Sequence, residues 1–150
     1  MKDNDLARLL SEAVSAAYAE TPSLFDKKGI EQAMVFRIGI HLHKLLQSTE
    51  LKHYQLDCEY NKKGDDPKRD INGTAIRPDL IVHQRGDNHE SANKLAVEFK
   101  EWWNKNTGDT FKLENLTHRD GGYAYQLGVF VVLGREAPEY TYFKHGVQCR

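Results

Sequence analysis

The stretch RPDLIVHQRGDNHESANKLAVEFK, residues 77–100, decides how this chain is expected to fold. Its two ends are short apolar runs, Arg77–His83 and Leu95–Lys100, with the β-branched and aromatic character of β-strands. Pro78 lies near the start of the first run, where a missing amide donor is tolerated. Arg85–Asn88 is typical of the start of a loop. We therefore predict two strands, and neighbouring positions in a sheet would bring their polar residues together.

Charged side chains interrupt both predicted strands. Glu98 and Lys100 are two residues apart, so on a strand they point to the same face, while Phe99 points to the opposite, core-packed face. Asp79 interrupts the preceding strand in the same way. Charges are costly to bury in an apolar strand without partners. If both strands turn these groups toward one opening, two carboxylates and one ammonium group meet there.

This combination of charges suits metal-assisted attack on a phosphodiester. Asp79 and Glu98 can share Mg²⁺, which prefers oxygen ligands and keeps several waters, and Mn²⁺ is expected to substitute for it. A bound metal ion lowers the pKa of a bound water and neutralises charge on the phosphate. Lys100 can then position that water or stabilise the transition state. The pattern predicts a metal-dependent nuclease.

The pattern acidic-x-Lys is weak by itself, because it occurs at Asp26, Glu50, Asp66 and Glu98. Only Glu98 lies in a predicted strand with the chain's single Pro-Asp pair shortly before it. The context therefore selects Glu98 among these positions. An ordinary ion pair between Glu98 and Lys100 on an edge strand stays open as the alternative, since surface ion pairs are common.

The rest of the sequence surrounds these strands with further elements. Periodicity and alternation predict helices over about Asp5–Ala19, Ile30–Gln47 and Asp109–Leu116, and strands over Gln55–Tyr60, Tyr123–Leu133 and Tyr140–Phe143. In the third helix Asp109 is the expected N-cap, and Phe111 and Leu116 are expected to face inward. The order α-α-β-β-β-α-β-β predicts a single α/β domain over residues 1–150, a mixed sheet covered by helices.

Glu31 is a further candidate for the site. It lies one turn before Val35 on the apolar stripe of the second helix, so its side chain should face the sheet. A carboxylate there is either a capping group in the first turn, favoured by the helix dipole, or an additional acid for the site. Both interpretations stay open.

Several other groups have an ordinary structural explanation beside a functional one. Lys112 is expected to be solvated, with phosphate contact as the alternative, and Lys68 belongs to a long polar loop expected to be mobile and solvated. His83 shares a face with Asp79 and is either a neighbour of the site or a satisfied core histidine. The pair Trp102-Trp103 can stack on bases or pack against helices or a partner subunit.

Composition limits the classes of function. With 150 residues, 39% hydrophobic and 29% charged, the chain fits one globular domain. Its net charge of −1 disfavours avid, non-specific binding of nucleic acid unless a local basic path or a cation supplies positive charge. No apolar run reaches the length of a membrane span, and the polar start lacks a signal peptide, so we expect a cytoplasmic protein with Cys58 and Cys149 as free thiols.

Together, these motifs resemble the PD-(D/E)XK nuclease superfamily, especially its small uncharacterised bacterial members. The resemblance extends from about Glu31 to Leu133 and rests on the helix with Glu31 followed by the strands Asp57-Cys58-Glu59-Tyr60-Asn61, Arg77–His83 and Leu95–Lys100. It implies a restriction-endonuclease-like core, a central mixed four-stranded sheet flanked by helices (αβββαβ), here with an added N-terminal helix.

The resemblance also implies roles for particular residues. Asp79 and Glu98 would bind Mg²⁺, Lys100 would assist hydrolysis, and Glu31 would be the additional helix acid, with DNA a better expectation than RNA as substrate. All these positions match the family pattern. Because some members have lost activity, a non-catalytic module that binds nucleic acid or a protein partner stays open as the alternative. A structural subunit forming a homodimer through Trp102-Trp103 is a third interpretation.

Overall fold

The computed structural model describes residues 1–60, 62–63, 66–87, 89–104 and 109–149, without the side chains of Asp66 and Asp109. Within those ranges the helices are α1 (Asp3–Glu20), α2 (Glu31–Leu46) and α3 (Asp109–Thr117), with short 3₁₀ turns at Pro22–Leu24 and Glu90–Ala92. The strands are β1 (Gln55–Cys58), β2 (Lys62–Lys63), β3 (Asp66–Pro67), β4 (Leu80–His83), β5 (Asn93–Glu101), β6 (Leu127–Leu133), β7 (Pro138–Lys144) and β8 (Val147–Gln148). The predicted α/β class is confirmed.

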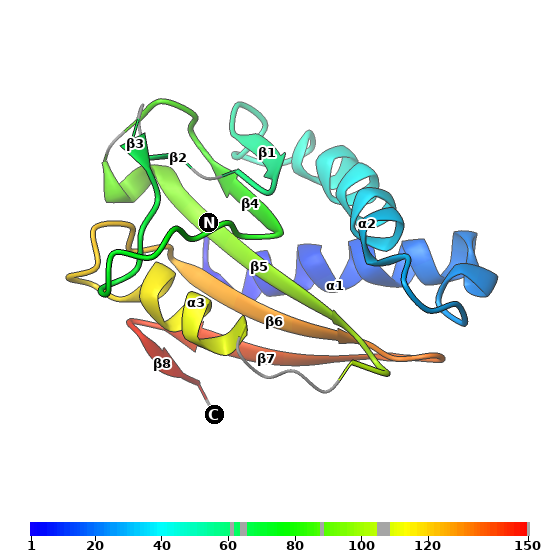
Figure 1. The fold of residues 1–150 in the computed structure, drawn as a ribbon. Helices are drawn as coiled ribbons and strands as arrows, with labels where there is room; N and C mark the ends of the chain where they lie inside the picture. The colour runs from blue at the N-terminus through cyan, green and yellow to red at the C-terminus, as the bar shows by residue number, and fades with distance from the viewer. Residues whose placement is uncertain (61, 64–65, 88, 105–108, 150) are drawn as a thin grey trace.

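The main sheet has the strand order β1-β4-β5-β6-β7-β8 (Figure 1). Only the β5–β6 pair is parallel among the described pairings, and α3 lies between these two strands in the chain. The prediction of a four-stranded sheet is wrong, because the described sheet has six strands. The C-terminal hairpin accounts for the difference: β7 pairs with β6 from Gly128 to Leu133, and β8 pairs with β7.

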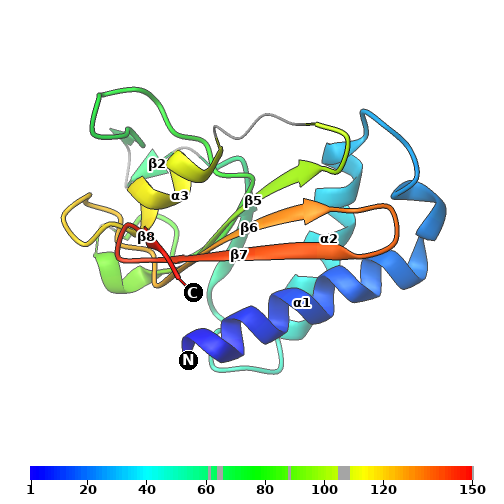
Figure 2. The ribbon, with the colours of Figure 1, turned by 90° about the horizontal axis from the view of Figure 1, so that it is seen from below.

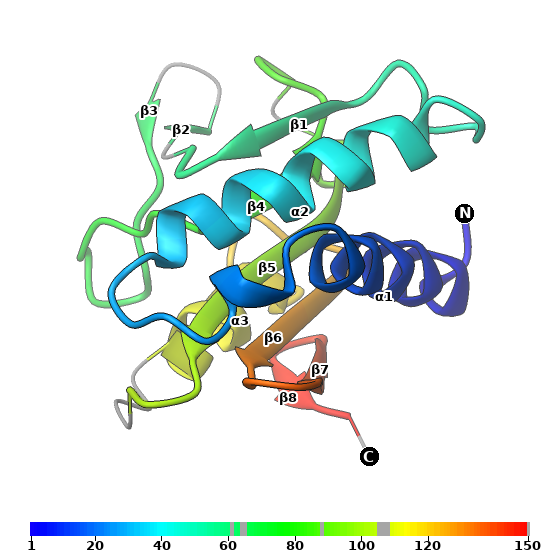
Figure 3. The same ribbon diagram turned by 90° about the vertical axis from the view of Figure 1, so that its right-hand side faces the viewer.

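Helices cover both faces of this sheet. Figure 2 shows α1 and α3 on opposite sides of the strands, and Figure 3 views the sheet from the α1 and α2 side. Alternation along the central strands explains this arrangement, because β4 and β5 carry buried apolar residues on both faces. On β5, Val97 and Phe99 pack in the larger core beneath α1 and α2, whereas Ala96 packs in the smaller core beneath α3.

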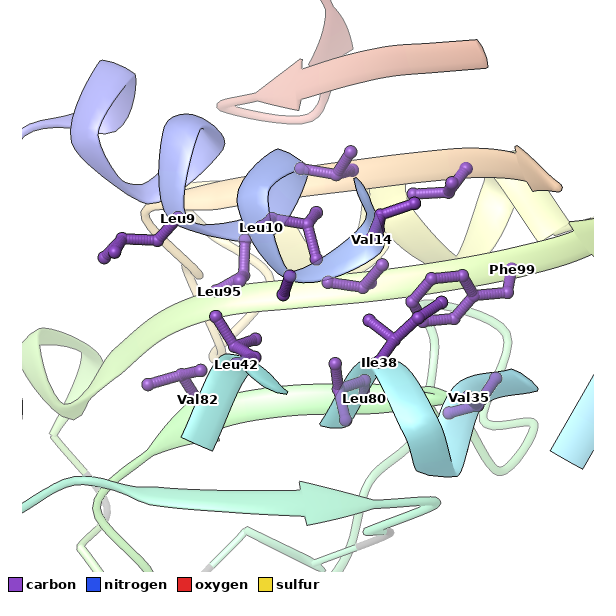
Figure 4. Close-up of a cluster of buried hydrophobic side chains, with 14 of the residues drawn as sticks. Leu9, Leu10, Val14, Val35, Ile38, Leu42, Leu80, Val82, Leu95 and Phe99 are labelled. Carbon is purple, nitrogen blue, oxygen red and sulfur yellow. The ribbon is translucent and has the colours of Figure 1, made fainter. Parts of the chain in front are cut away.

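The larger core forms where the apolar stripes of α1 and α2 meet the sheet. Figure 4 shows Leu10 and Val14 of α1 and Ile38 and Leu42 of α2 converging on the strands, where Leu80, Leu95 and Phe99 lie. On each helix, residues three or four positions apart lie on the same face, and the residues on that face are apolar here. Burying each such side chain contributes about 1.5–3 kcal/mol, which makes this layer the main support of the fold.

The predicted elements agree with the structure, with small differences at their ends. β1 stops at Cys58 because Glu59 adopts a left-handed backbone with φ 51°, and β6 begins at Leu127, after the irregular segment at residues 118–126. Phe111 was expected to face inward but is 41% exposed. The buried residue Leu113 is two positions later, and residues two apart on a helix point in nearly opposite directions. The predicted N-cap role of Asp109 lies outside the described side chains.

No helix in the described part of the chain is both long enough and apolar enough to span a membrane.

Candidate active site

Asp79 immediately precedes β4 and is held there from two sides. Its backbone carbonyl accepts a hydrogen bond from the amide of Glu59 (3.1 Å), which ties it to the end of β1. Its side-chain Oδ2 accepts a hydrogen bond from the backbone amide of Phe99 at 2.8 Å. Leu80 pairs with Val97 in the antiparallel register, so Asp79 lies opposite Glu98. The fold therefore places these two carboxylate residues side by side.

Glu98 lies in the interior of the sheet, on β5, with its side chain toward α3. Its residue is only 1% exposed. Lys112 on α3 approaches it, with 3.5 Å between the Lys112 Nζ and Glu98 Oε2 atoms, and the side chain of Lys112 is 37% exposed. Lys112 was expected to be solvated, and its side chain keeps part of that exposure while it approaches Glu98. A buried carboxylate favours a nearby cation because an uncompensated charge there is costly.

Lys100 follows Glu98 by two positions on β5 and shares its face. The residue is 9% exposed, and its backbone pairs with Val132 of the parallel strand β6. β5 lies between β4 and β6, so the alternative of an ordinary pair on an edge strand is wrong. Glu98 and Lys100 both lose most of their contact with water on this central strand, which costs free energy. Solubility therefore does not explain why charged residues occupy these positions.

Glu31 and Asp79 line the same pocket. It is the first residue of α2 and is half-buried. A pocket of about 280 Å³ lies between the start of α2 and the ends of β1 and β4, and its lining consists of Glu31, Gln32, Val35, Phe36, Cys58, Glu59 and Asp79. Asp79 thus belongs to this pocket and also contacts β5 beside Glu98. The first-turn position of Glu31 remains compatible with a favourable interaction with the helix dipole.

The loop that leads into α2 is fixed by the end of β5. Glu101 Oε2 accepts hydrogen bonds from the Gly29 amide (2.9 Å) and from the Trp103 indole nitrogen. Lys28 lies over both indole rings, 5.6 Å from the ring centre of Trp102 and 6.0 Å from that of Trp103. The tryptophan pair therefore packs on the loop before Glu31. A contact between subunits through Trp103 stays a prediction.

The donor set suits a hard cation. Within the described residues, no group of three or more His, Cys, Asp or Glu side chains is arranged to hold a metal ion. The fit therefore rests on the adjacent carboxylates of Asp79 and Glu98, with Glu31 nearby but not part of a described ligand group. Mg²⁺ is commonly held by one or two carboxylates, with water and substrate phosphate completing its coordination, so this pair is compatible with it.

His83 belongs to a separate group of charges on β1 and β4. Its Nε2 lies 2.7 Å from Asp57 Oδ2, and Arg85 Nε donates to the same oxygen at 3.1 Å. Burial raises the pKa of Asp57, but hydrogen bonds from Arg85 and His83 outweigh it and hold that pKa below its usual value. Burial likewise lowers the pKa of His83, against the influence of Asp57. These contacts confirm the interpretation of His83 as a core histidine with a hydrogen-bond partner.

Two features of this region were not predicted from the sequence. Lys68 is only 2% exposed, although its loop was expected to be solvated, and its ammonium lies 4.9 Å from the ring centre of Tyr60 and donates to the Lys62 carbonyl. Nothing in the local sequence indicates the burial of Lys68.

Phe36 lines the pocket beside Asp79 and is 60% exposed. Phe36 lies off the apolar stripe of α2, but a single exposed apolar residue is common on a protein surface and gives no signal in the sequence.

No protein-family model matches this sequence, and none of the curated proteins compared with it matches either. The features that bear on function are the arrangement of Asp79, Glu98, Lys100 and Glu31 and the pocket next to them.

Proposed function

We propose that this protein is a metal-dependent phosphodiesterase that hydrolyses nucleic acid, with DNA favoured over RNA, built on a restriction-endonuclease-like core of the PD-(D/E)XK type. One observation carries the proposal: the Asp79 carboxylate bonds to the amide of Phe99, next to Glu98 on the neighbouring strand. Lys100 follows on the same face of β5, where it is mostly buried. Two carboxylates and an ammonium group on neighbouring strands suit phosphodiester hydrolysis.

Each residue has a distinct part in this proposal. Asp79 and Glu98 would hold Mg²⁺, which when bound acts as a Lewis acid and supplies an activated water. The hydrogen bond from the Phe99 amide orients the Asp79 carboxylate and restricts the rotation of that side chain. Lys100 would orient the attacking water and stabilise negative charge that develops on the phosphate. Glu31 would act from the pocket side as the additional acid.

Cleavage assays test the proposal directly. The purified protein is incubated with single- and double-stranded DNA and RNA in Mg²⁺ or Mn²⁺, with and without a chelator. We expect cleavage that the chelator stops, and a loss of about 10²-fold or more in Asp79→Asn and Lys100→Met. Asp5→Asn is the matched control, because Asp5 lies on α1 away from the pair. Equal trace activity in wild type and Asp79→Asn on every substrate would refute the proposal.

A non-catalytic module that binds nucleic acid or a protein partner is the second candidate. It is favoured by the structural partners of the two acids, since Asp79 accepts the Phe99 amide and Glu98 lies beside Lys112. Such contacts can exist for stability alone. Calorimetry with Mn²⁺ separates the candidates: uptake that is lost in Glu98→Gln argues against the module, whereas an intact wild-type protein that takes up no metal favours it.

A further inference from the structure

The pocket next to Asp79 combines an aromatic face with acidic groups. Phe36 forms one side and is 60% exposed, while Val35 at 7% exposure contributes a buried apolar surface. The acidic residues Glu31, Glu59 and Asp79 also line this space. A pocket of about 280 Å³ with such a lining fits a flat, partly apolar group that carries hydrogen-bond donors.

The acidic lining disfavours a phosphate inside the pocket. Carboxylates repel an anion, whereas they accept hydrogen bonds from amino groups. At Glu59, the Oε2 atom lies 3.7 Å from Arg77 Nη1, and the side chain of Arg77 is 62% exposed. The lining therefore favours a neutral group that carries hydrogen-bond donors.

A nucleobase has the properties that this lining selects. Its flat face stacks on aromatic side chains, and the amino groups of cytosine and adenine donate hydrogen bonds to acidic side chains. The backbone that carries such a base would run past Asp79, which belongs both to the pocket and to the proposed site. A base inside a duplex cannot enter, because it is stacked and paired, unless it is flipped out at a cost of a few kcal/mol.

We propose that this pocket receives a single unstacked base that stacks on Phe36, so the preferred substrate is single-stranded or locally opened nucleic acid, with amino-bearing bases preferred over thymine or uracil. This inference rests on the proposed function in one respect: it places the base beside the carboxylate that would act on the neighbouring phosphate. The pocket and the exposed ring exist independently of any cleavage.

Binding without cleavage tests the inference. Fluorescence anisotropy of short labelled oligonucleotides is measured with Ca²⁺ in place of Mg²⁺, on single strands rich in cytosine or in thymine and on a duplex. We expect Phe36→Ala to weaken single-strand binding by about 5- to 100-fold, the usual range for loss of one base stack. Duplex binding should not change. Phe36 is exposed on the helix surface, so this substitution should leave the fold intact.

Phe111→Ala is the matched control, since it removes another exposed phenyl ring, 41% exposed, that does not line the pocket. A second readout is independent of affinity: in Phe36→Trp, the added indole emission should be quenched by a cytosine-rich strand. Equal loss in Phe36→Ala and Phe111→Ala, or no quenching in Phe36→Trp at saturating oligonucleotide, overturns the inference. Failure to bind any oligonucleotide also overturns it and points to a protein occupant.

The two proposals fail in different ways. Metal-dependent cleavage that Phe36→Ala leaves unchanged on single strands and duplexes alike refutes base capture and keeps the nuclease. Quenching of Phe36→Trp by single strands, without cleavage by the wild-type protein in any metal, supports base capture and refutes the nuclease.

Discussion

Glu98 carries a charge into a sheet position that is only 1% exposed, and Lys112 lies 3.5 Å from it across the space between α3 and β5. A buried carboxylate costs several kcal/mol unless nearby charges and donors compensate it. The sequence places Glu98 on a strand and Lys112 on a helix, but their contact depends on how α3 lies over β5. The proposed function and the stability of the fold are therefore linked at this residue.

We predict that Glu98 and Lys112 are energetically coupled. Lys112→Met should lower the free energy of unfolding by about 1–3 kcal/mol, because it removes a cation beside a buried carboxylate. In the background of Glu98→Gln the same change should cost less, with a coupling energy of about 1–2 kcal/mol. Urea unfolding of the wild type, both single variants and the double variant measures this. Additive effects would show that the contact contributes nothing.

Lys68 predicts a pH dependence of stability. Burial lowers its pKa to about 8 from an ordinary value of 10.5, although the charge of Asp57 acts in the opposite direction. Between these two values the unfolded chain binds more protons at this residue than the folded chain does. The stability contribution of Lys68 therefore increases as the pH rises through this window, and below about pH 8 its unfavourable effect is fully present.

Comparison with Lys68→Met isolates this effect. The free energy of unfolding of the wild type relative to that variant should rise with pH above about 8, by at most about 1.4 kcal/mol per pH unit. Other titrating groups are shared by both proteins and largely cancel. Urea unfolding at about pH 7 and about pH 9.5 provides the measurement. A difference that is independent of pH would show that Lys68 titrates normally.

Helix α3 packs closely on the sheet, and Gly128 on β6 permits this approach. A Cβ atom at this glycine would lie 2.8 Å from Thr117 Cγ2 and 3.3 Å from Phe143 Cβ. The absence of a side chain lets α3 lie directly on β6, which in turn holds Lys112 over Glu98. Gly39 on α2 differs, since a Cβ there would meet Leu56 and Leu80 at 3.5 and 3.7 Å, ordinary contact distances.

These two glycines should respond in opposite directions to alanine. Gly128→Ala should destabilise the protein by about 1–3 kcal/mol, because the added methyl group forces α3 away from the sheet. Gly39→Ala should be neutral or stabilise it by up to about 1 kcal/mol, since alanine favours a helix interior. Thermal unfolding of both variants gives the comparison. Equal effects would mean that the close approach of α3 is not needed.

The whole molecule carries a net charge of −1, and its candidate pocket is lined by carboxylates. Such a surface does not attract a polyanion over long distances. A divalent cation held by Asp79 and Glu98 would supply the local positive charge that binding requires. Nucleic-acid affinity is therefore expected to depend on metal more than on salt-sensitive lysine contacts.

We predict that removing divalent cations weakens binding of single-stranded DNA to the wild-type protein by at least about tenfold, or 1.4 kcal/mol. Asp79→Asn should bind weakly in Ca²⁺ and in chelator alike, because it lacks one of the carboxylates. Anisotropy titrations in Ca²⁺ and in chelator measure the difference, with Asp5→Asn as the control that keeps the metal response. Metal-independent affinity in the wild type would contradict the prediction.

Local patterns determined most of the secondary structure of this protein. The three- and four-residue spacing along α1 and α2 and the apolar runs of β4, β5 and β6 identify these elements, since periodicity reflects which face is buried. The polar residues Asp79, Glu98 and Lys100 stood out for the same reason: each interrupts an apolar run. The prediction that these residues share one candidate site depended on the assumption that neighbouring apolar runs pair as strands.

Only the tertiary structure decided the rest. The pairing of β7 with β6, the contact of Lys112 with Glu98 and the burial of Lys68 all join residues whose proximity local sequence does not encode. The same holds for the pocket that unites Phe36 with Asp79. Sequence periodicity shows which face of an element is buried, whereas strand order and helix placement decide what that face meets.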